Sequence, residues 1–261
     1  MAINKESNVY TIVFATIMVI VVGGILAFLA TSLKEAKLNN VQNEKKQNII
    51  QATGFYEDKS KVNRNEAGDL FNEFVKRRLT IDFEGNVVFD SKGELAEGKE
   101  EIDMKNPLDA FSVEPRKQYR TDDKDKLFPI FVCEKDGKTV YVVSCSGKGL
   151  WDDVWGYVGI GQDGNTIMAA KFDHKGETAG LGSIINEPKF QNQFNEDQNK
   201  TLEGPNGNYA GINVVKPGSQ DLNANTVDGL SGATFTGAGV RDMLNVYLEV
   251  YYNYFKNASA L

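Results

Sequence analysis

The N-terminal part of the chain contains one long apolar run. No charged residue occurs between Ser7 and Leu33. A helix over residues 10–33 would reach roughly 36 Å at about 1.5 Å per residue, enough to cross a hydrocarbon core of about 30 Å. The run is also longer than the apolar region of a cleaved signal peptide. We therefore expect residues 10–33 to form a retained transmembrane helix, preceded by an N-terminal tail of residues 1–9.

Helical patterns follow this run. Residues 34–54 are predicted to form a polar, partly amphipathic helix that ends at a glycine, and apolar positions recur at helical spacing within residues 65–79. Alternation from Thr80 to Phe89 predicts a strand, whereas residues 92–126 are charged and loop-like. We interpret residues 34–126 as a helical and connecting region packed on the next domain.

The rest of the chain alternates mainly with strand periodicity. Two apolar runs within residues 128–146 flank an Asp136-Gly137 turn, which predicts a β-hairpin. Residues 236–256 carry apolar side chains along one face, as in an amphipathic helix. Further strands are predicted in three segments: 157–160, 166–172 and near 212–216. The expected fold class is α+β, with an N-terminal transmembrane helix and an antiparallel-sheet domain, residues 127–261, with flanking helices.

The two cysteines lie on the two strands of the predicted hairpin. Its register pairs Cys133 with Val140 and Cys145 with Phe128, so the two thiols are not opposite each other. This register argues against a disulfide and favours two buried free cysteines.

Composition excludes several classes of function. With one histidine, two cysteines and no Cys-x-x-Cys motif, the chain alone cannot ligate an iron–sulfur cluster, a c-type haem or a structural zinc ion. We predict no metal site. The net charge of -7 and the isoelectric point near 5.0 argue against a nucleic-acid partner. Any redox role would therefore need an organic cofactor.

Residues 228–237, with the sequence DGLSGATFTG, place glycines and hydroxyl side chains directly before the predicted C-terminal helix. The N–H groups at a helix N-terminus bind anions, so a phosphate would be stabilised there. Neither a Walker A motif nor a dinucleotide-binding GxGxxG motif fits this stretch. On spacing alone, the simpler interpretation is a capping loop with Ser231, Thr234 or Thr236 as the N-cap.

The same stretch resembles a known modification signature. Its first seven residues, DGLSGAT, are similar to the Asp-x-x-Ser/Thr-Gly-Ala-Thr signature of the FMN-binding domains of the sodium-translocating NADH:quinone oxidoreductase and its Rnf relatives. In that family a dedicated flavin transferase joins FMN through its phosphate to the last threonine. The resemblance implies one covalent FMN on Thr234, whereas Thr236 lies outside the signature. The other implied binding residues of the signature are Asp228, Ser231, Gly232 and Ala233.

Two further segments carry the resemblance. Residues 176–182, GETAGLG, are similar to the family's second motif, although the family more often has proline at the position of Ala179. The pocket residues implied by this motif are Glu177, Thr178, Leu181 and Gly182. Residues 147–156, GKGLWDDVWG, resemble the C subunit of the sodium-pumping enzyme more than its Rnf counterpart. They add Gly149, Leu150 and Trp151 to the implied pocket.

Three assignments in these regions stay open. Trp151 beside an aromatic cofactor is physically sensible, but Trp151 and Trp155 fit equally well as ordinary core aromatics. Lys216 could meet the flavin oxygens or the phosphate, or it could lie on the surface. His174, the single histidine, is interpreted as a turn residue rather than a catalytic one.

The resemblance implies an electron carrier within a larger enzyme. We expect the C subunit of a sodium-translocating NADH:quinone oxidoreductase, which relays electrons through FMN on Thr234 and is not catalytic with NADH on its own. No catalytic residue is predicted. The implied partners are the other subunits of the complex, the flavin transferase and membrane lipid. The alternatives are an Rnf-type flavoprotein subunit and a membrane-anchored binding module without a redox role.

The side of the membrane is the remaining expectation. By resemblance, the soluble domain lies on the extracytoplasmic side of a bacterial inner membrane. A count of lysines flanking the apolar run would instead place it in the cytoplasm, because Lys5 alone precedes the run while several follow it: Lys34, Lys37, Lys45 and Lys46.

Overall fold

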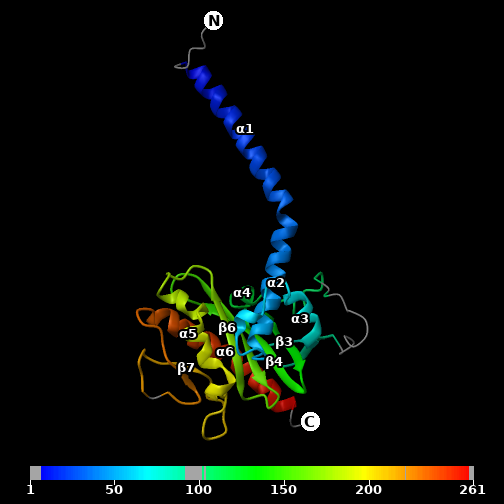
Figure 1. Cartoon of the computed structure of the whole chain (residues 1–261), viewed down its shortest axis with the longest axis vertical. Coiled ribbons are helices and arrows are strands. Elements are labelled where there is room, and N and C mark those ends of the chain that lie inside the picture. The colour runs from blue at the N-terminus through cyan, green and yellow to red at the C-terminus, as the bar shows by residue number, and fades with distance from the viewer. Residues whose placement is uncertain (1–6, 92–101, 103, 221, 259–261) are drawn as a thin grey trace. The chain divides into compact units, whose positions relative to one another are not determined.

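The computed structural model describes residues 7–91, 102, 104–220 and 222–258, so most of the predicted N-terminal tail lies outside the described residues. The chain divides into two compact units between Lys45 and Lys46. Helix α1 (Asn8–Ser32) belongs to the first unit (Figure 1). Among the described residues, α1 is the one helix that is long and apolar enough to cross a membrane, with a mean hydropathy of 2.9. The predicted N-terminal apolar helix is confirmed.

Helix α2 (Lys34–Ala52) ends inside the second unit, where Ile49, Ile50 and Ala52 are buried. It stops before Gly54, which has a φ of 73°. The predicted helix and its glycine stop agree with the structure. Because a left-handed backbone strains any residue with a side chain, a glycine is favoured at this position.

The second unit is built on a six-stranded sheet with the strand order β2-β1-β3-β4-β5-β6, in which every neighbouring pair is antiparallel. The strands are β1 (Val75–Ile81), β2 (Val87–Asp90), β3 (Phe128–Lys135), β4 (Lys138–Lys148), β5 (Asp153–Gly161) and β6 (Ile167–His174). The predicted antiparallel sheet is confirmed, and β5 starts four residues before the predicted strand.

Strand β4 shows how the sheet separates two apolar cores. Val143 and Cys145 belong to the core that contains helix α6 (Thr234–Ala258), whereas Val140 and Val142 belong to the core that contains the end of α2 and helix α3 (Ala67–Phe74). Successive side chains of a strand point to opposite faces, so helices cover both faces of the sheet. The α+β class with flanking helices is confirmed.

The hairpin of β3 and β4 has the predicted register. Cys133 is paired with Val140, and the turn residues Asp136 and Gly137 have φ values of 50° and 78°, as a two-residue type I′ turn requires. Cys133 and Cys145 are free and buried in the two different cores. Burial raises the pKa of both thiols. The prediction of two buried free cysteines is confirmed.

The helix predicted over residues 65–79 is too long. Helix α3 ends at Phe74, and the chain continues as β1. Two interactions hold this segment extended: its pairing with β3, and an ion pair between Arg78 and Asp109 at 2.9 Å, with side chains only 2% and 1% exposed. Helical spacing of the apolar residues could not reveal either long-range contact.

The single strand predicted from Thr80 to Phe89 is instead a hairpin. Strands β1 and β2 pair on either side of a turn in which the Asp82 carboxylate accepts the backbone N–H of Asn86 at 2.8 Å. Gly85 has a φ of 86° in this turn. The Asp, Gly and Asn residues are typical turn formers, and they outweigh the apolar alternation on both sides.

The remaining elements are short. Residues 92–101 and 103, part of the predicted loop 92–126, lie outside the described residues. The strand predicted near 212–216 is β7 (Asn213–Val214), which pairs with β8 (Thr226–Val227) in parallel and not within the antiparallel sheet. The short helices within the described residues are α4 (Pro115–Gln118), α5 (Pro188–Gln191), η1 (Lys59–Lys61), η3 (Asp123–Asp125), η4 (Gly182–Asn186), η5 (Asn192–Phe194) and η6 (Glu196–Gln198).

Candidate functional site

Helix α6 begins at Thr234, two residues earlier than predicted, so the last residue of the DGLSGAT motif is the first residue of the helix. The N–H of Gly237 donates to the carbonyl of Ala233 at 3.0 Å, which leaves the N–H groups of residues 234–236 at the start of the helix, where helical partners are missing. The Thr234 side chain is exposed. An accessible hydroxyl therefore lies where a helix favours a negative charge.

Three segments that are distant in sequence meet at the start of α6. They are the acceptor loop (228–234), the glutamate loop (176–182) and the tryptophan loop (149–152). A Cβ at Gly232 would lie only 2.9 Å from Leu181 Cδ2, which places the first two loops in contact. The N–H of Trp151 donates to Glu177 Oε1 at 3.0 Å, and this hydrogen bond connects the tryptophan loop to the glutamate loop. The structure thus brings together the three motifs that carry the resemblance.

The two threonines of this helix start have different environments. Thr236 is only 1% exposed, and its hydroxyl donates to Glu177 Oε2 at 2.6 Å. Thr234 and Ser231 are exposed. The signal for burial of Thr236 was present in the sequence, because Thr236 shares a helix face with Val240 and Met243, four and seven residues later.

Four large apolar side chains around the site are exposed, unlike most apolar residues of the domain. They are Leu150 (45% exposed), Trp151 (68%), Leu181 (41%) and Phe235 (73%). Exposed apolar side chains that gather around one point are typical of a ligand or interaction surface. Trp151 is therefore not a core residue, and Phe235 is a site candidate that the motif comparison missed.

Asp228 shapes the acceptor loop. Its carboxylate accepts the N–H groups of Gly218 at 2.7 Å and Gly229 at 3.1 Å, and its own N–H donates to Gln193 Oε1 at 2.6 Å. Because the carboxylate already accepts two backbone donors, Asp228 acts here as a turn-forming residue. The neighbouring Lys216 is exposed. Gln193, which holds the backbone of the acceptor loop through this hydrogen bond, is another residue that sequence analysis missed.

The glutamate loop is held by its own backbone and by the single histidine. The carbonyl of Thr178, whose side chain is exposed, accepts the N–H groups of Leu181 and Ser183. His174 Nδ1 accepts the N–H of Glu177 at 3.2 Å. His174 is the last residue of β6 and not a turn residue, and its ring supports the loop that follows the strand.

Charged residues brace the tryptophan loop. The buried Asp153 carboxylate accepts a hydrogen bond from Arg120 Nη2 at 2.6 Å, and Asp152 forms an ion pair with Lys175 at 2.6 Å. The hydrogen bond from Lys175 holds the pKa of Asp152 below its ordinary value. Sequence reasoning missed this network, because Arg120 lies in the segment that was predicted to be a loop.

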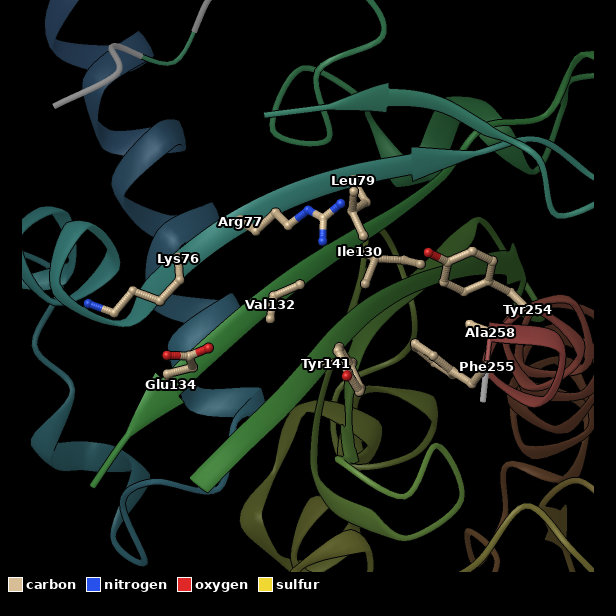
Figure 2. Close-up of a pocket in the computed structure, with 10 residues that line it drawn as sticks. All are labelled: Lys76, Arg77, Leu79, Ile130, Val132, Glu134, Tyr141, Tyr254, Phe255 and Ala258. Atoms are coloured by element: carbon tan, nitrogen blue, oxygen red, sulfur yellow. The ribbon is translucent and has the colours of Figure 1, made fainter. Parts of the chain in front are cut away.

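Two grooves lie at the other end of α6. One has a volume of about 670 Å³, with Lys76 and Glu134 at one end and Tyr254 and Phe255 at the other (Figure 2). A second groove of about 780 Å³ shares Tyr254 with it. Phe255 is about 30 Å from Thr234 along the helix at about 1.5 Å per residue, so these grooves are separate from the site around Thr234.

Comparison with known proteins adds the family. Residues 149–249 match the family of the FMN-binding domain, a range that contains all three loops. NqrC, the C subunit of the Na(+)-translocating NADH-quinone reductase, from Haemophilus ducreyi is 30% identical over 243 residues, which cover 91% of this chain and 88% of that protein. This chain belongs to the NqrC family.

Further members of the NqrC family agree over nearly the full length. The Vibrio alginolyticus protein is 27% identical over 260 residues, covering 95% of this chain and 93% of that protein. The crystal structure of the family member from Parabacteroides distasonis has a TM-score of 0.68 at 32% identity, covering 85% of this chain and 96% of that chain. The family expectation is confirmed, and the Rnf-type and non-redox alternatives are set aside.

Membership of the NqrC family establishes the general function of the chain. The chain is an FMN-binding subunit of the Na(+)-translocating NADH-quinone reductase, a membrane complex with other subunits. The apolar helix α1 is consistent with a membrane anchor in this complex.

Proposed function

We propose that this subunit carries one FMN joined by a phosphoester to Thr234, and that the flavin relays electrons between redox centres of the complex. The contrast between the two threonines at the start of α6 carries the proposal. The Thr234 side chain is exposed, whereas Thr236 is buried and donates to Glu177. A modifying enzyme can therefore reach the hydroxyl of Thr234 but not that of Thr236.

The residues around Thr234 fit FMN. The free N–H groups at the start of α6 would hold the phosphate. Leu181, Trp151 and Phe235 offer exposed apolar surface to an isoalloxazine ring, and their exposure is otherwise costly for a soluble domain. The same three loops contain further residues from the motifs: Leu150, Thr178, Ser231, Gly232 and Ala233. When bound, the flavin supplies the electron transfer, and the protein supplies position and retention.

A relay role also fits the features of the chain. The sequence contains neither a dinucleotide-binding fingerprint nor a Walker A motif. We therefore propose that NADH and quinone bind to other subunits, and that a flavin transferase modifies Thr234 before assembly.

The attachment and the relay are tested together on the full chain produced with a flavin transferase. We expect flavin fluorescence to stay with the denatured chain, and peptide mass mapping to place the FMN on Thr234. We also expect dithionite to reduce this flavin, while NADH leaves it oxidised unless the other subunits are present. Flavin that separates on denaturation would refute the covalent bond, and reduction by NADH without partners would refute the relay.

We further propose that the domain after α1 is extracytoplasmic. The resemblance to the NqrC family supports this side, and the positive-inside rule weakens when a long domain follows the helix. The two native cysteines are buried, so a cysteine introduced at the exposed position Lys216 is a clean reporter. We expect a membrane-impermeant maleimide to label Lys216→Cys in intact spheroplasts. Labelling that appears only after membrane permeabilisation would instead place the domain in the cytoplasm.

A further inference from the structure

Glu177 is a buried carboxylate between three segments of the site. It is 7% exposed, and each of its two oxygens accepts one hydrogen bond. Oε1 accepts the N–H of Trp151 at 3.0 Å, and Oε2 accepts the hydroxyl of Thr236 at 2.6 Å. One side chain therefore joins the tryptophan loop to the first turn of α6.

Two glycines lie against this carboxylate, and neither position has room for a side chain. A Cβ at Gly149 would clash with Glu177 Oε1 and lie 2.9 Å from Glu177 Cδ. A Cβ at Gly182 would clash with Glu177 Oε2 and lie 2.6 Å from Thr236 Oγ1. These separations are far below van der Waals contact, so both glycines are explained by the position of Glu177 and not by space for a ligand.

The Glu177 carboxylate is stabilised by hydrogen bonds. Both groups that donate to the carboxylate are neutral, one a backbone N–H and the other a hydroxyl. The positive end of the α6 dipole, next to Thr236, adds further stabilisation. A buried carboxylate that lost either donor would be left with an unsatisfied oxygen, so this geometry is strongly favoured over alternatives.

The first turn of a helix depends on such anchors. Its N–H groups lack helical partners, and helix ends fray readily. Residues two positions apart are about 200° apart around the axis. Fixing Thr236 inward therefore presents Thr234 outward, and the hydrogen bond from Thr236 to Glu177 supplies this fixing point.

We propose that Glu177 is a positioning residue for flavin attachment. It holds the first turn of α6 in the phase that presents Thr234 to the transferase, and it holds the backbone of Trp151 at the edge of the same site. It acts through Thr236 and Trp151, not by touching the flavin. This inference rests on the proposed attachment at Thr234 and names the residue that prepares the acceptor.

The test measures the rate of flavin attachment to the purified, unmodified full chain when transferase and its flavin substrate are added. We expect Glu177→Ala and Gly182→Ala to slow attachment roughly ten- to a hundredfold, because small displacements of reacting groups cost that much. Glu177→Gln should be slowed less, because its amide oxygen still accepts a hydrogen bond. Gly176→Ala is the matched control in the same loop, since its Cβ would lie an ordinary 3.7 Å from Asp152 Cβ.

A second measurement is independent of flavin and transferase. In a Trp155→Phe background, Trp151 is the only tryptophan. Because Trp151 is already 68% exposed, its fluorescence anisotropy reports the mobility of its loop. We expect Glu177→Ala and Gly182→Ala to lower this anisotropy relative to Gly176→Ala, because loss of the hydrogen bond to Glu177 increases the mobility of the loop. Thr236→Val, which replaces the hydroxyl with a methyl group of similar size, should slow attachment with little change in Trp151 anisotropy.

The outcomes separate this inference from the proposed function. Wild-type attachment rates in Glu177→Ala and Thr236→Val would overturn the positioning role, as would unchanged Trp151 anisotropy in Glu177→Ala. If Glu177→Ala fails to fold, the attachment rate of Thr236→Val and the Trp151 anisotropy of Gly182→Ala decide in its place. If the wild-type chain accepts no flavin at Thr234, the proposed function fails and the inference falls with it, even where the anisotropy confirms the contact of Glu177 with the tryptophan loop.

Discussion

Replacement of Thr234 by alanine is expected to abolish covalent FMN attachment. The phosphoester needs a hydroxyl at this position, and no neighbouring hydroxyl offers an equivalent. Thr236 is 1% exposed and donates to Glu177, and Ser231 precedes the helix start that would hold the phosphate. Intact-mass spectrometry of the full chain, produced with a flavin transferase, should show the FMN increment in the wild type and the unmodified mass in Thr234→Ala.

Two matched variants isolate the hydroxyl of Thr234. Thr234→Ser keeps a hydroxyl on the same carbon and should retain attachment at a reduced rate. Ser231→Ala removes an exposed hydroxyl of the same loop and should still carry FMN on Thr234. Because Thr234 is exposed, its replacement should change the free energy of unfolding by only about 0.5 kcal/mol. FMN found on Thr236 or Ser231 in Thr234→Ala would contradict the assignment of the acceptor.

The hairpin of β3 and β4 was predictable, because both strands alternate between two buried faces. In β4, Val140 and Val142 face one core, while Val143 and Cys145 face the other. The Asp136-Gly137 turn then fixes the register of the hairpin. Local patterns were sufficient here, since pairing and turn involve residues that are close in sequence.

The end of helix α3 was not predictable by the same reasoning. Leu70, Phe71 and Phe74 continue a helical spacing into Val75, but the chain turns into β1 at that residue. Arg78, whose ion pair helps to hold β1 extended, lies within the segment to which helical spacing was assigned. Its partner, Asp109, is distant in sequence and lies in a segment expected to be a loop.

The supporting contacts of the site were hidden for the same reason. Glu177 and Thr236 are far apart in sequence, and the motif resemblance assigned Glu177 to the flavin and left Thr236 outside. The structure instead has the two side chains bonded to each other. Motifs identified the segments that meet, whereas the hydrogen bonds between them required the fold.

The buried ion pair gives the second large prediction. Asp109→Ala should lower the free energy of unfolding by about 3–5 kcal/mol, because it leaves the Arg78 guanidinium buried without its partner. Asp109 also accepts the backbone N–H of Phe111 at 2.8 Å, so its removal also loses this hydrogen bond. Stabilities of single domains are about 5–15 kcal/mol, so this loss is a large share. Urea unfolding of the full chain in detergent, followed by tryptophan fluorescence, measures it.

The adjacent arginine supplies the control. Arg77 forms a two-point contact with Asp90 on the surface, where the side chains are 46% and 27% exposed. Removing this partner by Asp90→Ala should cost about 0–1 kcal/mol, because solvent screens the pair and hydrates the remaining charge. Replacing both buried partners together, as in Arg78→Met with Asp109→Leu, should recover much of the stability lost in Asp109→Ala, since no buried charge is then left unpaired. Equal losses in Asp109→Ala and Asp90→Ala would show that burial does not set the strength of the inner pair.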